Sequence, residues 1–159
     1  MPDTPKDACE LLDSDHIAVK HLFVAYARQA VGAPAETAAE RTALAQRICE
    51  ELTVHAQIEE EIFYPALRKA VPDARPLLDE AEAEHAGIKE LVAQIQAMAT
   101  ADAAMDDLVA RLAGEVEHHV KEERDELFPK AKAAPKLDLV ALAGQLRERQ
   151  QALKAGQPA

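Results

Sequence analysis

Residues 55–65 read HAQIEEEIFYP, and residues 119–129 read HVKEERDELFP. In both stretches a glutamate follows the histidine four residues later, and a proline follows it ten residues later. Residues four apart on an α-helix share one face, so each histidine–glutamate pair points at a common volume. The two stretches therefore predict two equivalent helices, each presenting an imidazole and a carboxylate in the same direction.

The similarity between the two halves of the chain extends to the preceding helices. DHIAVKHL (15–22) aligns with EHAGIKEL (84–91), which makes His16 and His85 equivalent. The offset is 69 residues for this pair (85 minus 16) and 64 for the later one (119 minus 55), and the difference falls where the connecting loops are expected. An internal duplication of a helix pair explains the whole pattern.

The rest of the sequence is typical of a helical protein. The 159 residues include only 5 glycines and no tryptophan, and alanine, leucine and glutamate dominate. Apolar spacing and breaks predict helices over residues ~9–31, ~36–70, ~75–99, ~103–133 and, shorter, ~137–153. Short connections favour antiparallel neighbours. We therefore expect an all-α fold, an antiparallel up-down-up-down four-helix bundle over 9–134, with a C-terminal helix over 136–154 packed on or near it.

Composition and charge argue against a nucleic-acid partner, a membrane partner and secretion. The formal net charge is −11, and such a surface repels phosphate backbones, so we expect no nucleic-acid partner. No segment approaches the ~20 apolar residues that span a bilayer, so we expect no membrane partner. The N-terminal MPDTPKDACELLDSDH lacks the basic start and apolar run of a signal peptide. Because Cys9 and Cys49 form no CxxC motif, a cytoplasmic protein with reduced thiols is the simplest interpretation.

The histidine–glutamate pairs lie on helical stripes that are otherwise apolar. Leucine, isoleucine and valine flank His55 and Glu59 in one repeat and His119 and Glu123 in the other. These groups are costly in a bundle interior unless a cation pairs with them, and imidazole plus carboxylate suits iron, manganese or zinc. A stripe of solvated ion pairs is the alternative. Metal binding is favoured because chance does not readily supply the same pair twice, each preceded by an acidic-His dipeptide.

These motifs resemble those of the hemerythrin-like family with its HHE cation-binding domain, and the resemblance spans residues ~10–134. The family motif is a first-helix histidine in DH or EH, followed by a basic residue and Leu, then His-x-x-x-Glu and an aromatic-Pro, all repeated. This sequence supplies, in order, His16, His55, Glu59, Tyr64-Pro65, His85, His119, Glu123 and Phe128-Pro129. The family membership suggested here implies a four-helix bundle around a metal centre.

The resemblance also implies a particular cofactor and ligand set. It implies a non-haem di-iron centre with an oxo or hydroxo bridge, one iron on His16 and His55 and the other on His85 and His119. Glu59 and Glu123 would bridge the irons, and the remaining positions would be open to O₂, peroxide or nitric oxide. Oxygen-carrying hemerythrins have a further histidine where this chain has Lys89. This departure argues against simple reversible O₂ transport.

Residues near the motif have less specific interpretations. Glu51 and Glu115, one turn before His55 and His119, either accept a hydrogen bond from a ligand histidine or lie on a solvated edge. We expect surface positions for the remaining histidines, His21 and His118. Tyr64 either lines the site or packs in the core, which we favour. We expect a solvated face for Glu60, Glu61, Glu122, Asp125 and Glu126, and the alternative is that one of them supplies an extra ligand.

Three functions remain open at this stage. The first is a binding or sensing protein for O₂, nitric oxide or iron in redox or iron homeostasis. The second is a di-iron enzyme that acts on peroxide or repairs iron centres damaged by oxidative or nitrosative stress. The third is an interaction module whose metal is mainly structural. The C-terminal helix either caps the bundle, which we favour, or pairs two chains, so we expect a monomer or a weak homodimer.

Overall fold

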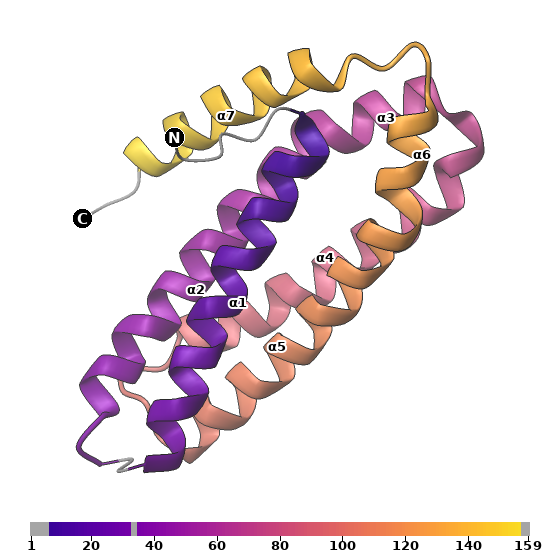
Figure 1. Cartoon of the computed structure of the whole chain (residues 1–159). Coiled ribbons are helices and arrows are strands. Elements are labelled where there is room, and N and C mark those ends of the chain that lie inside the picture. The colour runs from indigo at the N-terminus through magenta and orange to yellow at the C-terminus, as the bar shows by residue number, and fades with distance from the viewer. Residues whose placement is uncertain (1–6, 33–34, 157–159) are drawn as a thin grey trace.

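A computed structural model describes residues 7–32 and 35–156, and every regular element within these ranges is helical (Figure 1). The first six residues of the N-terminal stretch discussed above lie outside these ranges. The four long helical segments form an up-down-up-down bundle in which each segment packs against the next, and the first packs against the last. The predicted all-α bundle with a fifth, C-terminal helix is therefore confirmed.

The first half of the bundle contains α1 (Ala8–Gly32), α2 (Ala38–Ile58), a π-helical turn η1 (Glu59–Phe63) and α3 (Tyr64–Ala70). A 3₁₀ turn η2 (Pro72–Ala74) leads to the second half, which contains α4 (Arg75–Gln96), α5 (Ala103–Glu122), a second π turn η3 (Glu123–Leu127) and α6 (Phe128–Ala133). The chain ends in α7 (Leu139–Ala155).

The helices expected over ~36–70 and ~103–133 are continuous, but each contains a π turn. The N–H of Tyr64 donates to the carbonyl of Glu59, and the N–H of Phe128 donates to that of Glu123, which is an i→i−5 pattern. A proline follows immediately in both segments, at Pro65 and Pro129, and has no N–H to continue an α-helical ladder. Each π turn begins at a predicted metal-binding glutamate, a common location for π-bulges.

Two apolar clusters fill the bundle, one on each side of the histidines. The first contains residues such as Leu12, Ile58 and Leu78, and the second contains Val19, Leu52 and Ile88. Each predicted metal-binding histidine lies between members of the two clusters along its own helix. The predicted metal-binding residues therefore form a polar layer across an otherwise apolar core.

The C-terminal helix α7 packs on α1, α2 and η1 (Figure 1). Its N-terminus is capped by Asp138, whose carboxylate accepts from the N–H of Ala141 at 3.0 Å. Leu142 and Leu146 are buried and belong to the first apolar cluster. The helix thus covers one face of the first repeat. No helix in the described part of the chain is long and apolar enough to cross a membrane.

An ion pair between a buried arginine and a partly exposed aspartate joins the helices near the end of the bundle distant from α7. The guanidinium of Arg41 (1% exposed) donates to the carboxylate of Asp106, which also accepts from the Tyr26 hydroxyl at 2.7 Å. Removing one partner leaves the other charge buried and poorly compensated. Asp106→Ala is therefore expected to lower the free energy of unfolding by about 3 kcal/mol, measured by urea denaturation. The neighbouring exposed Asp107→Ala is the control, and equal stability of the two variants would contradict this account.

Candidate metal centre

All six predicted metal-binding residues converge on one buried volume in the middle of the bundle. Each is at most 7% exposed. The helices contribute them evenly: His16 from α1, His55 from the end of α2, Glu59 from η1, His85 from α4, His119 from α5 and Glu123 from η3. The pseudo-symmetry of the sequence is thus a pseudo-symmetry of the site.

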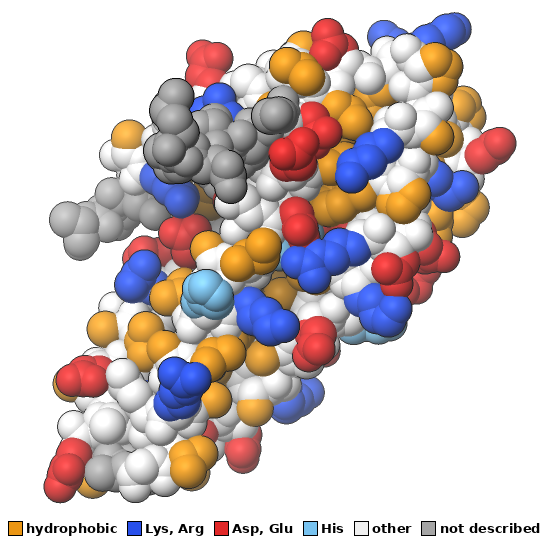
Figure 2. Space-filling view, viewed as in Figure 1, with side chains coloured by type: hydrophobic (Ala, Val, Ile, Leu, Met, Phe, Trp, Pro, Cys, Tyr) orange, Lys and Arg blue, Asp and Glu red, His pale blue; other side chains and the backbone are white. Residues whose placement is uncertain are grey.

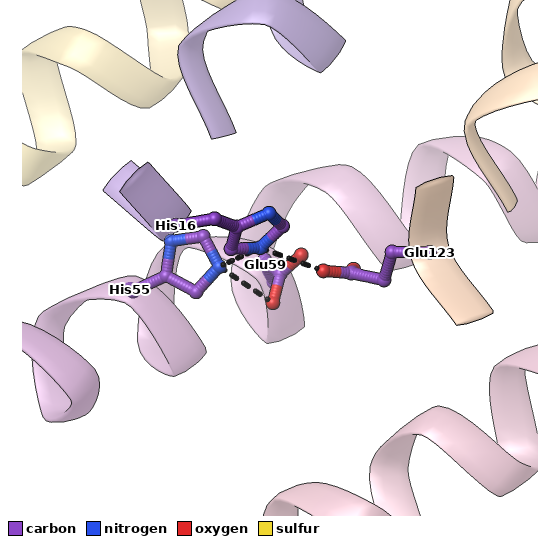
Figure 3. A group of neighbouring side chains, drawn as sticks. All are labelled: His16, His55, Glu59 and Glu123. Carbon is purple, nitrogen blue, oxygen red and sulfur yellow. Dashed lines mark hydrogen bonds and ion pairs between the residues drawn. The ribbon is translucent and has the colours of Figure 1, made fainter. Parts of the chain in front are cut away.

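Four of these residues form a first group (Figure 3). The Nε2 atom of His16 lies 3.1 Å from Nε2 of His55 and 3.0 Å from Oε1 of Glu123. Nε2 of His55 lies 3.2 Å from Oε1 of Glu59. When two ligand atoms each lie about 2.1 Å from one metal ion, they are about 3.0 Å apart in octahedral coordination and about 3.4 Å apart in tetrahedral coordination. The spacing of this group fits a shared ion.

The second group contains His85, His119 and again Glu59. The Nε2 atoms of the two histidines are 3.1 Å apart. Oε1 of Glu59 lies 3.1 Å from Nε2 of His85 and 3.8 Å from Nε2 of His119. Oε1 of Glu123 lies 3.5 Å from Nε2 of His119. Each glutamate therefore faces histidines of both groups, through its Oε1 atom in every case.

A carboxylate outside the centre contacts the Nδ1 atom of each histidine. The pairs are His16–Asp13 at 3.2 Å, His55–Asp15 at 3.1 Å, His85–Glu60 at 2.8 Å and His119–Glu84 at 2.7 Å. An ionised carboxylate only accepts hydrogen bonds, so each Nδ1 carries the proton and each Nε2 lone pair faces the centre. This is the tautomer that a metal-binding histidine needs.

The sequence pattern did not predict these outer carboxylates. Glu51 and Glu115 were the candidates along the same helices, but Glu51 pairs with Lys154 of α7 at 3.3 Å. Glu60, expected on a solvated face, contacts His85. The available signal was the acidic residue before each first-helix histidine, since Asp15 and Glu84 both reach the histidine of the neighbouring helix.

The converging groups carry more acceptors than donors. Oε2 of Glu59 and Oε1 of Glu123 are buried without a hydrogen-bond partner. Four imidazole lone pairs face the same volume, so the layer requires added positive charge. Metal ions supply that charge and fit the donor set, because imidazole and carboxylate together bind iron, manganese or zinc.

Without metal, protons must supply this charge, and the pKa values of His119 and His55 are raised accordingly. Burial opposes the charge on His119, but the hydrogen bond that its ring donates to Glu59 and the charges of Glu123 and Glu59 raise its pKa to about 9. The pKa of His55 is likewise raised against burial, mainly by the charge of Glu59. Burial disfavours charge on Glu59 also, yet the charge of His55 holds its pKa well below the usual range. Burial and the charge of Glu59 raise the pKa of Glu123.

Tyr64 brings a hydroxyl into this layer. The side chain is fully buried, and its hydroxyl donates to Oε2 of Glu123 at 2.9 Å and lies 3.3 Å from Nε2 of His85. Burial, followed by the charges of Glu59 and Glu123, raises its pKa well above the ordinary value, so it stays protonated. Tyr64 thus packs in the core, as expected, and also reaches the site. Its repeat equivalent is Phe128, which has no hydroxyl.

Lys89 lies outside the converging groups. Its ammonium contacts Oε1 of Glu60 at 2.7 Å, and Oε2 of Glu60 contacts Nδ1 of His85. Lys89 therefore supports an outer carboxylate at the position where oxygen carriers have a further histidine. His21 and His118 are exposed, as expected.

Two hollows adjoin the centre. A cavity of about 20 Å³ is lined by the four histidines and by apolar side chains that include Val116 and Val120. A groove of about 510 Å³ lies between α1 and α5, and His16, Val116 and Val120 line it as well. The cavity has room for about one small molecule. These three side chains line both the cavity and the groove.

The fold and the converging histidines and glutamates define a cation-binding helical bundle. The family described as the hemerythrin HHE cation-binding domain matches residues 7–131. The chain belongs to this family, as the motifs predicted.

Two known proteins are similar to the chain. The crystal structure of a hemerythrin HHE cation-binding domain-containing protein from Mycobacterium kansasii superposes with a TM-score of 0.73 and 24% identity, over 94% of this chain and 88% of that one. That likeness supports the fold. A protein of Nostoc sp. named DNA nickase is 36% identical over 84 residues, which is 52% of this chain. The match spans only 23% of the Nostoc protein.

Proposed function

We propose that this chain is a non-haem di-iron protein that binds or senses a small ligand (O₂ or nitric oxide) or iron itself, in redox or iron homeostasis. In this proposal His16 and His55 hold one iron, His85 and His119 hold the other, and Glu59 and Glu123 bridge them. The observation that carries it is the buried convergence of four imidazole Nε2 atoms on two carboxylates, each with an unpartnered oxygen. The iron pair would supply redox chemistry and open coordination positions.

The surroundings of the centre favour a small ligand without charge. The 20 Å³ cavity beside the histidines is walled mainly by apolar side chains and suits a diatomic molecule or a peroxide. The groove between α1 and α5 offers an approach past His16 and the two valines that it shares with the cavity. Water is otherwise kept from the centre by the apolar clusters on both sides.

A second candidate function is an enzyme that acts on peroxide or repairs iron centres damaged by oxidative or nitrosative stress. The Tyr64 hydroxyl favours it, because this group holds a proton 2.9 Å from Glu123 inside the layer. A protonated group beside the centre can donate to a ligand that gains electrons. Lys89, in place of a further histidine, argues against simple O₂ transport in either case.

We propose no nucleic-acid partner, although the Nostoc relative is named DNA nickase. The formal net charge of −11 opposes binding to phosphates. On the face in Figure 2, lysine and arginine side chains are interspersed with acidic ones and form no continuous basic patch. A cytoplasmic monomer or weak homodimer without a membrane partner completes the proposal.

Iron content and the visible spectrum test this function together. Protein from iron-replete cells should carry about two iron atoms per chain, measured by elemental analysis. The reason is that each histidine pair, together with the two shared glutamates, provides the ligands for one iron. After reduction without oxygen, O₂, nitric oxide and peroxide are added in turn. A reversible charge-transfer band indicates binding, whereas repeated turnover of peroxide with return to the oxidised state indicates the enzyme.

The matched variants are His119→Ala and His21→Ala. The first should lose mainly one iron atom, and the second, at an exposed position on α1, should keep both. Iron-free protein from iron-replete cells, or two irons retained in His119→Ala, would contradict the proposed centre.

A further inference from the structure

The outer carboxylates of the two repeats are held in different ways. Asp15 and Glu84 are equivalent in the duplication, and each contacts Nδ1 of a histidine on the neighbouring helix. In the second repeat, Oε2 of Glu84 lies 3.2 Å from Nε2 of His118, which is on the same helix as His119. The second repeat thus holds this carboxylate with one of its own side chains.

The first repeat has no such side chain at the equivalent position. With the offset of 64 residues, His118 corresponds to Val54 (118 minus 64), which is 3% exposed and has no polar side-chain atom. The donor comes instead from α7, which lies outside the duplicated unit. The amide nitrogen of Gln150 donates to both oxygens of Asp15, at 3.1 Å and 2.9 Å.

Gln150 is not what attaches α7 to the bundle. Leu142 and Leu146 bury the apolar face of the helix, and Arg149 pairs with Glu61 of η1 at 2.8 Å. The Gln150 amide can therefore be removed while the helix stays docked. Its contact with Asp15 then has one remaining consequence, which is the orientation of the carboxylate.

We propose that Gln150 is a positioning residue for the metal position formed by His16 and His55. It fixes the Asp15 carboxylate, which in turn fixes the ring of His55 and the proton on its Nδ1. The C-terminal helix thereby becomes a functional part of the centre. This inference rests on the proposed di-iron function and adds that the two metal positions depend on different parts of the chain.

The expected size follows from the place of Gln150 in this chain of contacts. Loss of a group that directly holds a metal-binding histidine typically costs 10–100-fold in metal affinity. Gln150 acts one contact further out, and Asp15 keeps its own bond to His55. Gln150→Leu, which keeps the volume but has no donor, should therefore release one iron about tenfold faster to a ferrous chelator. The other iron, on His85 and His119, should leave at the wild-type rate.

The experiment compares four proteins loaded with ferrous iron: wild type, Gln150→Leu, Gln150→Lys and Arg149→Met. Arg149→Met is the matched control, because it removes a docking contact of α7 without touching Asp15. Gln150→Lys restores a hydrogen-bond donor toward Asp15. It should therefore release the iron on His16 and His55 more slowly than Gln150→Leu does. The Mössbauer spectrum of the oxidised proteins gives a second readout, in which Gln150→Leu should alter one of two iron signals.

The outcomes separate the inference from the function on which it rests. If wild type binds two irons but Gln150→Leu and Arg149→Met release them alike, Gln150 merely docks the helix and the inference is wrong. Acceleration of both irons equally in Gln150→Leu would overturn it as well. If wild type binds no iron, the di-iron function fails and the inference fails with it.

Discussion

Removing the metal with a chelator is expected to lower the unfolding temperature by about 10 °C. A ligand at 1,000 times its dissociation constant stabilises the fold by about 4 kcal/mol, and in a chain of this size each kcal/mol moves the midpoint by about 2–4 °C. Unfolding is followed by circular dichroism before and after chelation, and after iron is added back. An unchanged midpoint on chelation would show that no ion occupies the polar layer of the purified protein.

The unfolding temperature of the metal-free protein should depend on pH, because protons on the histidines then supply the positive charge that metal supplies in the loaded protein. The pKa of His119 is about 9 in the fold, above its ordinary value of 6.5, and that of His55 is also raised. A raised histidine pKa contributes stability that is complete below pH 6.5 and is lost as the pH rises through the folded value. The metal-free protein should therefore lose stability between pH 6.5 and about 9. The midpoint difference from the loaded protein should widen over that range.

Substituting one of the two glutamates proposed to bridge the irons is expected to empty both metal positions. Oε1 of Glu59 lies 3.2 Å from Nε2 of His55 and 3.1 Å from Nε2 of His85, so it belongs to both groups of converging atoms. Glu59→Gln keeps the size of the side chain but removes the negative charge that would face both ions. Iron content should fall from about two atoms per chain to well under one, since neutral amides bind iron weakly.

The control for this substitution is Glu61→Gln. Glu61 lies in the same π turn but pairs with Arg149 at the surface, so iron content should be unchanged. If Glu59→Gln still carried two irons, neither ion would depend on this carboxylate. If it lost one only, Glu59 would be a terminal ligand and not a bridge.

The six converging residues were predictable because two regular patterns specify them. The spacing of four residues places a histidine and a glutamate on one face, and the duplication supplies their equivalents. The bundle follows from the same helices, since their apolar stripes must be buried against one another. Helical periodicity is a local property, and it survives any small change in how the helices are packed.

The outer contacts depend on packing between helices, and no single helix encodes them. Asp15 is 40 residues from His55 in the chain, and Gln150 is 135 residues from Asp15. Which carboxylate meets which Nδ1 is decided by the relative rotation of neighbouring helices and by side-chain rotamers. The prediction for Glu51 and Glu115 used the spacing along one helix, whereas the observed partners of Nδ1 on His55 and His119 come from adjacent helices.

The π turns have a consequence for helical phase. Along an α-helix, residues five apart differ by about 140° around the axis (five steps of ~100°), so Tyr64 would point away from the side that Glu59 faces. Closing the hydrogen bond at i→i−5 brings the two nearly into line. Phe63 and Tyr64 are both fully buried, and Leu127 and Phe128 are both buried. One extra residue per turn thus delivers a carboxylate and an aromatic ring to the same side of each long helix. Shortening either turn by one residue would put everything after it out of phase.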